Sequence, residues 1–469
     1  MSGTPASGGL RRVLVANRGE IAVRILRACF DEGLETVLAV SAADRESLAA
    51  QLADRVVVIG PAAPAESYLD INRVMAAATL TGCDALHPGY GFLSERPELA
   101  VACEKAGVIF IGPGPDAMRA SGDKAAARSL ARSLDIPVGA GTDIVAGEAD
   151  AAEAAERIGF PVLLKAAAGG GGRGMRRVDS ATELSGAWAA AAGEARQAFG
   201  DGRLFVERYV RRARHVEVQV LADRHGTVVH LGERDCSLQR RYQKLVEEAP
   251  AVGLPDDVRA AMHAAAVRLI GAVGYEGAAT CEFLVDAAPS GTSATPFGFL
   301  EINARLQVEH PVTEMVTGLD LVREQLRIAA GLPLSFAQHD VVATGHAIEV
   351  RVNAECPEDG FRPCPGRIDR WAAPVGHGVR VDTACYPGWE IPPHYDSLLA
   401  KVIVRGDDRP AALARLRHAL DHLTVAGIPT TAPFTRALLD HPAVVAGAVH
   451  TTWLEDTFLA GKIHPTSDD

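Results

Sequence analysis

Five polar side chains stand at every second position of the stretch 299–311. They are Glu301, Asn303, Arg305, Gln307 and Glu309. In an extended chain the side-chain period is two, so we expect these groups on one face and the intervening aliphatic residues on the other. An ordinary half-exposed strand also alternates in this way. Here, however, every polar position carries a group that can bind a metal ion or an anion or move a proton, which favours a functional site.

A second polar strand is predicted beside this stretch. Residues 280–286 have a strand pattern, and residues 287–296 would join the two strands as a hairpin. That pairing places Glu282 near Glu301. Two neighbouring carboxylates repel each other unless one is protonated or a cation lies between them. Hard cations such as Mg²⁺ take oxygen ligands of this kind and often complete their shell with substrate phosphates.

A glycine run is the second candidate for phosphate binding. The strand pattern at 161–165 ends in Lys165 and is followed by A-A-A-G-G-G-G-R-G-M. Consecutive glycines let backbone N–H groups turn toward an anion, and Lys165 adds positive charge. A flexible linker is the alternative, but the run lies between a buried-type strand and a basic segment at 175–178, so we interpret it as a mobile phosphate lid. It is not a Walker loop, because G-x-x-x-x-G-K-[ST] is absent.

Several of these stretches resemble one family. E-I-N-A-R-L-Q-V-E-H-P-V-T-E at 301–314, N-R-G-E-I-A-V-R at 17–24 and H-P-G-Y-G-F-L-S at 87–94 are similar to the biotin carboxylases, which are ATP-grasp enzymes. The resemblance covers residues 11–457. It implies an ATP-dependent ligase that carboxylates biotin with bicarbonate through carboxyphosphate, the first half-reaction of an acetyl-CoA or other acyl-CoA carboxylase.

The resemblance also implies a role for each matching residue. Glu309 would take the proton from bicarbonate, and Arg351 would stabilise the biotin enolate. The implied catalytic residues are Arg305, Glu309, Arg351 and Lys244, and the implied ligands of two Mg²⁺ or Mn²⁺ ions are Glu282, Glu301 and Asn303. Bicarbonate and biotin would contact Lys244, Arg305, Gln307, Val308, Glu309 and Arg351. ATP would contact Lys124, Lys165, Gly169, Gly170, Gly171, Gly172, Met175, Glu207, Arg208, Tyr209, Val210, His215, Gln239, Tyr242 and Leu284.

Some of these assignments have plainer alternatives. A lone histidine such as His215 in a strand is more often structural, and the basic residues around Lys244 could be a solvated charge run. The chain also departs from the family pattern: Tyr242 stands where His is common, and Ala167-Ala168 replaces Ser-Gly. Because Tyr can still donate a hydrogen bond, we expect altered nucleotide contacts rather than lost activity.

The elements that must position these residues fall into three predicted units. Residues 11–121 alternate short strands with helices, which indicates a parallel sheet with helices on both faces and a ligand loop at 87–94. The unit lacks G-x-G-x-x-G, so a dinucleotide site is rejected. Strands are predicted at 13–16, 36–40, 56–59, 85–86 and 108–111, and helices at 21–30, 71–80 and 96–106.

The predicted fold class is α/β (α+β) with a three-part ATP-grasp architecture. It comprises a Rossmann-like pre-ATP-grasp domain at 11–121, an ATP-grasp domain at 122–340 with its lid at about 137–208, and a biotin carboxylase C-terminal domain at 341–457. The last domain carries Glu349, Arg351 and Asn353 on one face of a strand.

Length and composition narrow the possible settings. The 469 residues carry a net charge of −12, which argues against nucleic acid or an anionic membrane as a main partner. No run approaches the ~20 apolar residues of a membrane span, and the eight cysteines are scattered with no C-x-x-C pair. A reduced, cytoplasmic protein is therefore expected.

The chain has no A/V-M-K-M segment for a biotinyl lysine and no carboxyltransferase segment. We therefore expect a free-standing subunit whose partners are a biotin carboxyl carrier protein and a carboxyltransferase. The family also implies a homodimer, with a possible contact near Arg24. The runner-up function is another bicarbonate-using ATP-grasp synthetase, of the carbamoyl phosphate type, and a third is a non-catalytic nucleotide-binding module. The sequence does not indicate whether the carboxybiotin serves an acyl-CoA, a pyruvate or a urea pathway.

Overall fold

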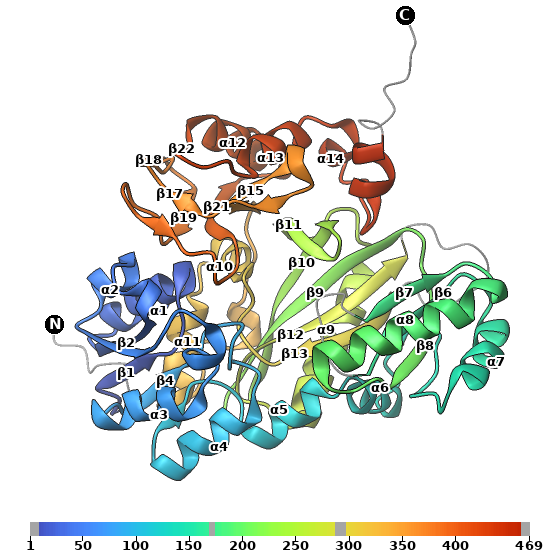
Figure 1. Ribbon diagram of the computed structural model, residues 1–469, viewed down its shortest axis with the longest axis horizontal. Coiled ribbons are helices and arrows are strands. Elements are labelled where there is room, and N and C mark those ends of the chain that lie inside the picture. The colour runs from blue at the N-terminus through green and yellow to red at the C-terminus, as the bar shows by residue number, and fades with distance from the viewer. Residues whose placement is uncertain (1–8, 168–173, 287–296, 461–469) are drawn as a thin grey trace, which may run out of the picture.

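The computed structural model describes residues 9–167, 174–286 and 297–460. The glycines at 169–172 and the hairpin loop predicted at 287–296 lie outside these described residues. Figure 1 shows an N-terminal unit and a C-terminal unit stacked on one side, and a smaller unit of strands and helices on the other, around a long curved sheet. The predicted mixed α/β class is confirmed.

The N-terminal sheet has five parallel strands in the order β3-β2-β1-β4-β5. The strands are β1 Arg12–Val15, β2 Glu35–Ser41, β3 Arg55–Gly60, β4 Ala85–His87 and β5 Ile109–Phe110, and the helices are α1 Gly19–Asp31, α2 Leu48–Leu52, α3 Ile71–Leu80, α4 Pro97–Ala106 and α5 Pro115–Gly122. The strand order reverses between β1 and β4, which is where such sheets bind ligands. Asn17 links the loops that follow β1 and β4 at this point, because its Nδ2 donates to the main-chain oxygens of Pro88 and Tyr90.

A small antiparallel sheet, β7-β6-β8, forms the unit on the right of Figure 1. Its strands are β6 Val162–Ala166, β7 Met175–Val178 and β8 Leu204–Arg208, and its helices are α7 Glu148–Ile158 and α8 Ala181–Phe199; α6 Lys124–Ser133 precedes them. Small side chains such as Ala151, Ala155 and Ala195 let the helices lie close to the sheet and form a core of their own with Leu164 and Val206.

The largest sheet is antiparallel, with eight strands in the order β13-β12-β9-β10-β11-β14-β21-β19. The strands are β9 Ala213–Ala222, β10 Val228–Arg240, β11 Gln243–Ala249, β12 Gly277–Asp286, β13 Phe297–Asn303, β14 His346–Asn353, β19 Val379–Thr383 and β21 Leu398–Gly406. Strand β11 pairs with β14, so one sheet continues across residue 341, where the sequence suggested a boundary between units.

The other elements cover this sheet or extend the C-terminal unit. The helices are α9 Asp256–Val273, α10 His310–Thr317, α11 Leu321–Ala329, α12 Arg409–His422, α13 Ala432–Leu438 and α14 Pro442–Val445, with a π-helical turn at Leu454–Leu459. Short paired strands are β15 Glu355–Cys356 with β16 Arg362–Pro363, β17 Gly366–Arg367 with β20 Glu390–Ile391, and β18 Arg370–Ala372 with β22 Thr424–Ala426. None of the helices in the described ranges combines the length and apolar character needed to cross a membrane.

The strand predicted at 299–311 is too long. Strand β13 ends at Asn303, residues 304–309 are irregular, and helix α10 begins at His310. Pro311 explains the change, because proline has no N–H to donate to a sheet ladder and fits the first turn of a helix. The apolar side of α10 then packs on the sheet through Val312 and Val316. The polar residues after Asn303 therefore reach the site from a turn.

Candidate active site

Lys244 on β11 lies at the centre of the polar cluster on the large sheet. Its Nζ is 2.6 Å from Oε2 of Glu217 and 3.3 Å from Oε1 of Glu282, and it also contacts Glu309. Burial alone would lower the pKa of Lys244, but the acidic groups around it, Cys236 and Glu217 among them, raise it well above its usual value. The side chain is therefore a permanent cation that faces three carboxylates.

Glu309 is a fully buried member of this group of carboxylates. It immediately precedes α10, is 0% exposed, and binds Nη2 of Arg351 at 3.0 Å in addition to Lys244. Burial would raise the pKa of Glu309, but the charges of Lys244 and Arg351 outweigh it and hold the pKa well below its usual range. Glu309 is thus ionised and able to accept a proton, and its basicity rises when these cations turn to another anion.

The remaining polar residues of the 301–309 stretch converge on the same place. Nη1 of Arg305 donates to Oε1 of Gln307 at 2.9 Å, and Nε2 of Gln307 lies 3.4 Å from Oε1 of Glu282. Nδ2 of Asn303 donates to that same oxygen at 2.8 Å. Val308 differs, because its main-chain oxygen accepts a hydrogen bond from Lys401. The structure therefore brings the predicted set together although the strand that was to align them ends early.

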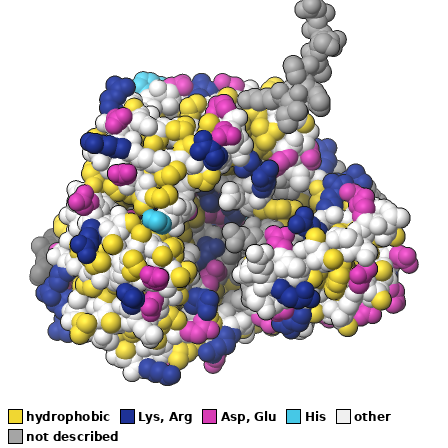
Figure 2. Space-filling model, viewed as in Figure 1, with side chains coloured by type: hydrophobic (Ala, Val, Ile, Leu, Met, Phe, Trp, Pro, Cys, Tyr) yellow, Lys and Arg dark blue, Asp and Glu magenta, His cyan; other side chains and the backbone are white. Residues whose placement is uncertain are grey.

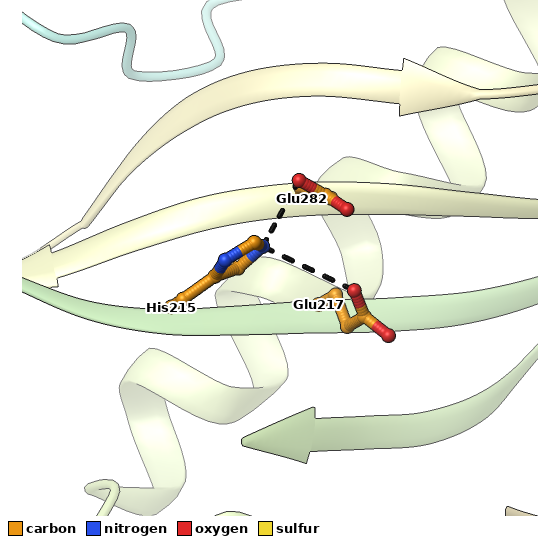
Figure 3. A group of neighbouring side chains, drawn as sticks. All are labelled: His215, Glu217 and Glu282. Atoms are coloured by element: carbon orange, nitrogen blue, oxygen red, sulfur yellow. Dashed lines mark ion pairs between the residues drawn. The ribbon is translucent and has the colours of Figure 1, made fainter. Parts of the chain in front are cut away.

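The predicted carboxylate pair is present in the strand register. Glu282 lies directly opposite Glu301 across β12 and β13. In the described chain, however, each carboxylate has a basic partner: Glu301 binds Nζ of Lys124 at 2.7 Å, and Glu282 binds Nε2 of His215 at 2.9 Å. Burial lowers the pKa of His215, but the Glu282 carboxylate more than compensates, and the net shift is upward. Figure 3 shows His215 reaching from β9 toward Glu282, with Glu217 beside it.

This donor set fits a hard divalent cation. Glu282 and Glu301 offer carboxylate oxygens on one face of adjacent strands, and Asn303 offers an amide oxygen next to them. Among the described histidine, cysteine and acidic residues, the groups close enough to share one ion are His215 with Glu217 and Glu282, and Glu217 with Cys236 and Glu309. Glu282 belongs to the first group, and Glu301 is ion-paired with Lys124.

The expected nucleotide residues form a second group at the junction with the small sheet. Lys165 on β6 and Arg128 on α6 both bind the carboxylate of Glu207 on β8, and all three side chains are buried. Burial raises the pKa of Glu207, but the charges of Lys165 and Arg128 lower it by more, and the net shift is downward. The group is therefore ionised. Lys165 therefore does not point freely at a phosphate in this structure, and must separate from Glu207 to bind one.

The other predicted nucleotide contacts lie nearby. Met175 is opposite Lys165 across β6 and β7, and Leu284 is opposite His215 across β9 and β12. Nε2 of Gln239 donates to Nδ1 of His215 at 2.8 Å, which leaves Nε2 of that ring to face Glu282. Arg208, Tyr209 and Val210 end β8 and follow it, with Tyr209 under the guanidinium of Arg177. Tyr242 is 48% exposed in the β10–β11 turn. Figure 2 shows the face between the units hollowed, with Lys and Arg side chains inside.

Sequence reasoning missed four residues that hold the site together. Arg234 is 0% exposed and donates Nε to Glu217 at 2.7 Å and Nη1 to Thr313 of α10 at 3.0 Å. Arg128 binds Glu207, and Glu247 binds Nε of Arg351 at 2.6 Å. Glu217 and Glu247 could have been suspected from the sequence, because each lies two or three residues from a predicted site residue in a strand. For Arg234 and Arg128 the sequence offers no such indication beyond their positive charge.

Arg24, near which a dimer contact is predicted, is ion-paired within its own chain. Its Nη2 binds Glu314 at 2.9 Å and Asp320 at 2.6 Å, and the residue is 8% exposed. The dimer contact near Arg24 stays a prediction.

Three family models match the chain. The first, "Biotin carboxylase, N-terminal domain", matches residues 9–118, and "Biotin carboxylase C-terminal domain" matches residues 349–456. Between them, "Carbamoyl-phosphate synthase L chain, ATP binding domain" matches residues 123–337.

Curated proteins and solved structures agree with these matches. The chain is 47% identical to Biotin carboxylase 1 of Bacillus subtilis, over 97% of this chain and 100% of that protein. It is 48% identical to the biotin carboxylase of Pseudomonas aeruginosa, over 95% of this chain and 98% of that protein. A biotin carboxylase–βγ-ATP complex from Campylobacter jejuni superposes with a TM-score of 0.92 at 42% identity, over 96% of this chain and 99% of that one. The biotin carboxylase domain dimer of Hydrogenobacter thermophilus 2-oxoglutarate carboxylase, in complex with MgADP, ADP and bicarbonate, superposes with a TM-score of 0.91 at 42% identity. The match covers 95% of this chain and 97% of that one.

Proposed function

The chain belongs to the biotin carboxylase family, and from this premise we infer that it carboxylates biotin with bicarbonate at the expense of ATP. It is a ligase that uses ATP and Mg²⁺ or Mn²⁺, with biotin as the acceptor. The observation that carries the inference is the convergence of one ionised carboxylate, Glu309, with Lys244 and Arg351 in an enclosed site. The carbamoyl phosphate alternative accounts only for the central segment, since the flanking segments match biotin carboxylase models.

We propose that bicarbonate binds between Lys244 and Arg305 and gives its proton to Glu309. The planar fork of Arg305 matches a planar oxyanion, and Lys244 adds a point charge. Binding the anion draws Lys244 away from Glu309, which makes the carboxylate a stronger base at the moment it is needed. The activated bicarbonate oxygen then attacks the terminal phosphoryl group of ATP, the bond to the β-phosphate oxygen breaks, and carboxyphosphate and ADP form.

For the phosphoryl end, we propose Lys124 and Lys165 as the phosphate ligands. Glu282 and Glu301, with Asn303, would hold the two divalent ions, which when bound spread the charge of the transferring phosphoryl group. Lys124 and Lys165 are each ion-paired with a carboxylate before substrate arrives, so both would exchange that partner for phosphate oxygens. The unit at about 137–208 would close over the nucleotide as a lid.

We propose that Arg351 acts on biotin. Its guanidinium is held by Glu247 and Glu309, two fully buried carboxylates, and lies on the same strand face as the rest of the site. Carboxyphosphate would decompose to CO₂ and phosphate, and the phosphate would remove the proton from the biotin ureido nitrogen. Arg351 would stabilise the enolate oxygen that forms, and the ureido nitrogen would then attack the CO₂ carbon to give carboxybiotin. The role is separate in time from that of Glu309, although the two side chains touch.

We also propose the setting of the reaction. The biotin would be attached to a separate carrier protein, and a carboxyltransferase would use the carboxybiotin. The domain division at 121 and 340, the homodimer and a cytoplasmic location are further proposals, and the last is supported by eight cysteines that are all free thiols.

The test is ATP cleavage and fixation of radiolabelled bicarbonate by the purified chain. ADP formation should require bicarbonate and a divalent cation, and free biotin should accelerate it and accumulate label as carboxybiotin. Ammonia-dependent carbamoyl phosphate would instead support the alternative synthetase, and nucleotide binding without cleavage would support a non-catalytic module. Biotin-independent cleavage with no labelled product would overturn the proposal.

A further inference from the structure

Two fully buried glutamates face each other next to Arg351. Glu247 on β11 and Glu349 on β14 are paired directly in the antiparallel register, and each is 0% exposed. Side chains opposite each other on such a pair lie on one face with their Cβ atoms about 4.5–5.5 Å apart. Arg351 lies on that face as well, two residues beyond Glu349. Helix α10 covers this face of the sheet through Val312 and Val316, which pack against Ala347.

The hydrogen bonds of this pair are incomplete if both groups are ionised. Oε1 of Glu247 accepts from Nε of Arg351 at 2.6 Å, but its Oε2 has no partner among the described residues. Both carboxyl oxygens of Glu349 are buried and likewise have no partner in the described ranges. A buried acceptor left unpaired costs about 1–3 kcal/mol, and more when it carries charge. One proton on Glu349 would turn an unpaired acceptor into a donor aimed at the unpaired oxygen of Glu247.

The nearby cations are paired with other groups and not with the carboxylate of Glu349. Lys401 on β21 is one cation near Glu349, but its Nζ binds Glu20 at 3.0 Å and the main-chain oxygen of Val308 at 2.9 Å. Arg351 is held by Glu247 and Glu309. On α10, Glu314 binds Arg24 and Arg380 instead.

The rest of the surroundings are apolar or neutral. Burial and neighbouring cations keep His310 of α10 neutral by lowering its pKa far below the usual value. The opposite face of β14 packs through Ile348 and Val350 into an apolar core. No described cation therefore hydrogen-bonds to Glu349.

We propose that Glu349 carries a proton, which it donates in a hydrogen bond to Oε2 of Glu247, and that this neutral acid leaves the charge of Arg351 available to an anionic biotin. Glu349 is then a positioning residue, because it acts on substrate only through Glu247 and Arg351. The role rests on the proposed function of Arg351. An ionised Glu349 would be a third carboxylate around one guanidinium, after Glu247 and Glu309, and would oppose the approach of the enolate.

The direction of titration agrees with the geometry. Burial raises the pKa of Glu349 well above its usual value, and Glu247 raises it further against the opposing effect of Lys401. Burial also raises the pKa of Glu247 to about 7, although Arg351 opposes this. The pair therefore holds a proton at neutral pH and loses it only as the pH rises.

Glu349→Gln tests the proposal, because Gln has nearly the same shape, stays neutral at every pH and can donate an N–H to Glu247. Biotin carboxylation and bicarbonate-dependent phosphate release are measured side by side from about pH 6 to 9.5. In the parent, carboxylation should fall at high pH more steeply than phosphate release. In Glu349→Gln, activity near neutral pH should stay within about threefold of the parent, and the alkaline fall should move up by at least about one pH unit.

An infrared measurement gives a readout that does not depend on activity. The carbonyl stretch of a buried, protonated carboxylic acid should be present in the parent at neutral pH and absent in Glu349→Gln. Glu248→Gln is the matched control: Glu248 is on the same strand, is bound by His346 and Arg409, and should be ionised, so that variant should keep the band.

An unchanged band in Glu349→Gln, or an unmoved alkaline fall, would overturn the proposal. So would Glu349→Gln losing carboxylation and phosphate release in equal proportion while remaining folded by thermal melting. If the parent itself carboxylates no biotin, the function proposed above fails, and the infrared band still decides whether Glu349 is protonated.

Discussion

Replacing Arg351 by Gln should separate the two halves of the reaction. The guanidinium binds both Glu309 and Glu247, so its removal acts on each in a different way. Biotin loses the cation that faces its enolate oxygen. Glu309 loses one of its two cationic partners and keeps Lys244, which brings its depressed pKa back toward the usual value and makes it a stronger base.

The sizes of these effects can be worked from the contacts. Removing one preorganised donor to a developing oxyanion costs about 10²–10³ in rate, or roughly 3–4 kcal/mol. A hydrogen bond to a charged group contributes about 1.5–3 kcal/mol, so losing Arg351 should raise the pKa of Glu309 toward its usual value. Bicarbonate-dependent ATP cleavage should therefore stay within about tenfold of the parent, while carboxylation falls on the order of a hundredfold or more.

The assay measures phosphate release and carboxybiotin in the same reaction, with Glu309→Gln as the companion variant. Without its carboxylate base, Glu309→Gln should lose both activities together, by about 10²–10⁴. A thermal melt controls for folding, because Arg351→Gln leaves Glu247 without its partner and should lower stability by about 1–3 kcal/mol. If Arg351→Gln loses the two activities in equal proportion, the division of roles between Arg351 and Glu309 is wrong.

Three further predictions concern the metal, the nucleotide and pH. Glu301→Gln should weaken the Mg²⁺ dependence and cut turnover while ATP still binds; turnover within about threefold of the parent, under about 1 kcal/mol of barrier, would contradict the ligand assignment. Tyr242→His should change KM for ATP with little change in kcat, because Tyr242 is half exposed; a hundredfold loss of kcat would show an essential role. Burial lowers the pKa of His87 to about 3, so the unfolded chain takes up the proton first as the pH falls. The stability supplied by neutral His87 should therefore be complete above about pH 6.5 and lost toward pH 3, on the order of 5 kcal/mol in all, and His87→Asn should flatten this slope in urea unfolding.

Much of the fold could be predicted because local patterns agree with it. The alternation of short apolar strands and helices in the first unit, and the turn-rich loops after β1 and β4, are properties of neighbouring residues. The end of β13 could have been read from Pro311, but the polar alternation continued through it and concealed the break. Alternation alone does not distinguish a strand from a turn whose side chains reach one site.

The candidate site was less predictable because ion pairing depends on what the fold brings together. Motif resemblance placed Lys165 and Glu207 in the nucleotide site, but their mutual ion pair joins β6 to β8 and has no local signature. The same holds for Arg234, whose four acceptors come from strands β9 and β12 and helix α10. Glu349 was visible as a polar residue on the face of Arg351, yet its lack of a donor among the described residues is a property of the packed interior.

The pairing of β11 with β14 has a consequence for dividing the chain. A fragment ending near residue 340 would lack β14 and leave β11 as an unprotected edge, with its row of N–H and C=O groups open to other chains. It would also bring Lys244 and Glu247, which the intact sheet encloses, into contact with water. Such a fragment should self-associate through that edge. The ATP-binding segment therefore depends on the C-terminal strands to stay soluble, although it matches a family model of its own.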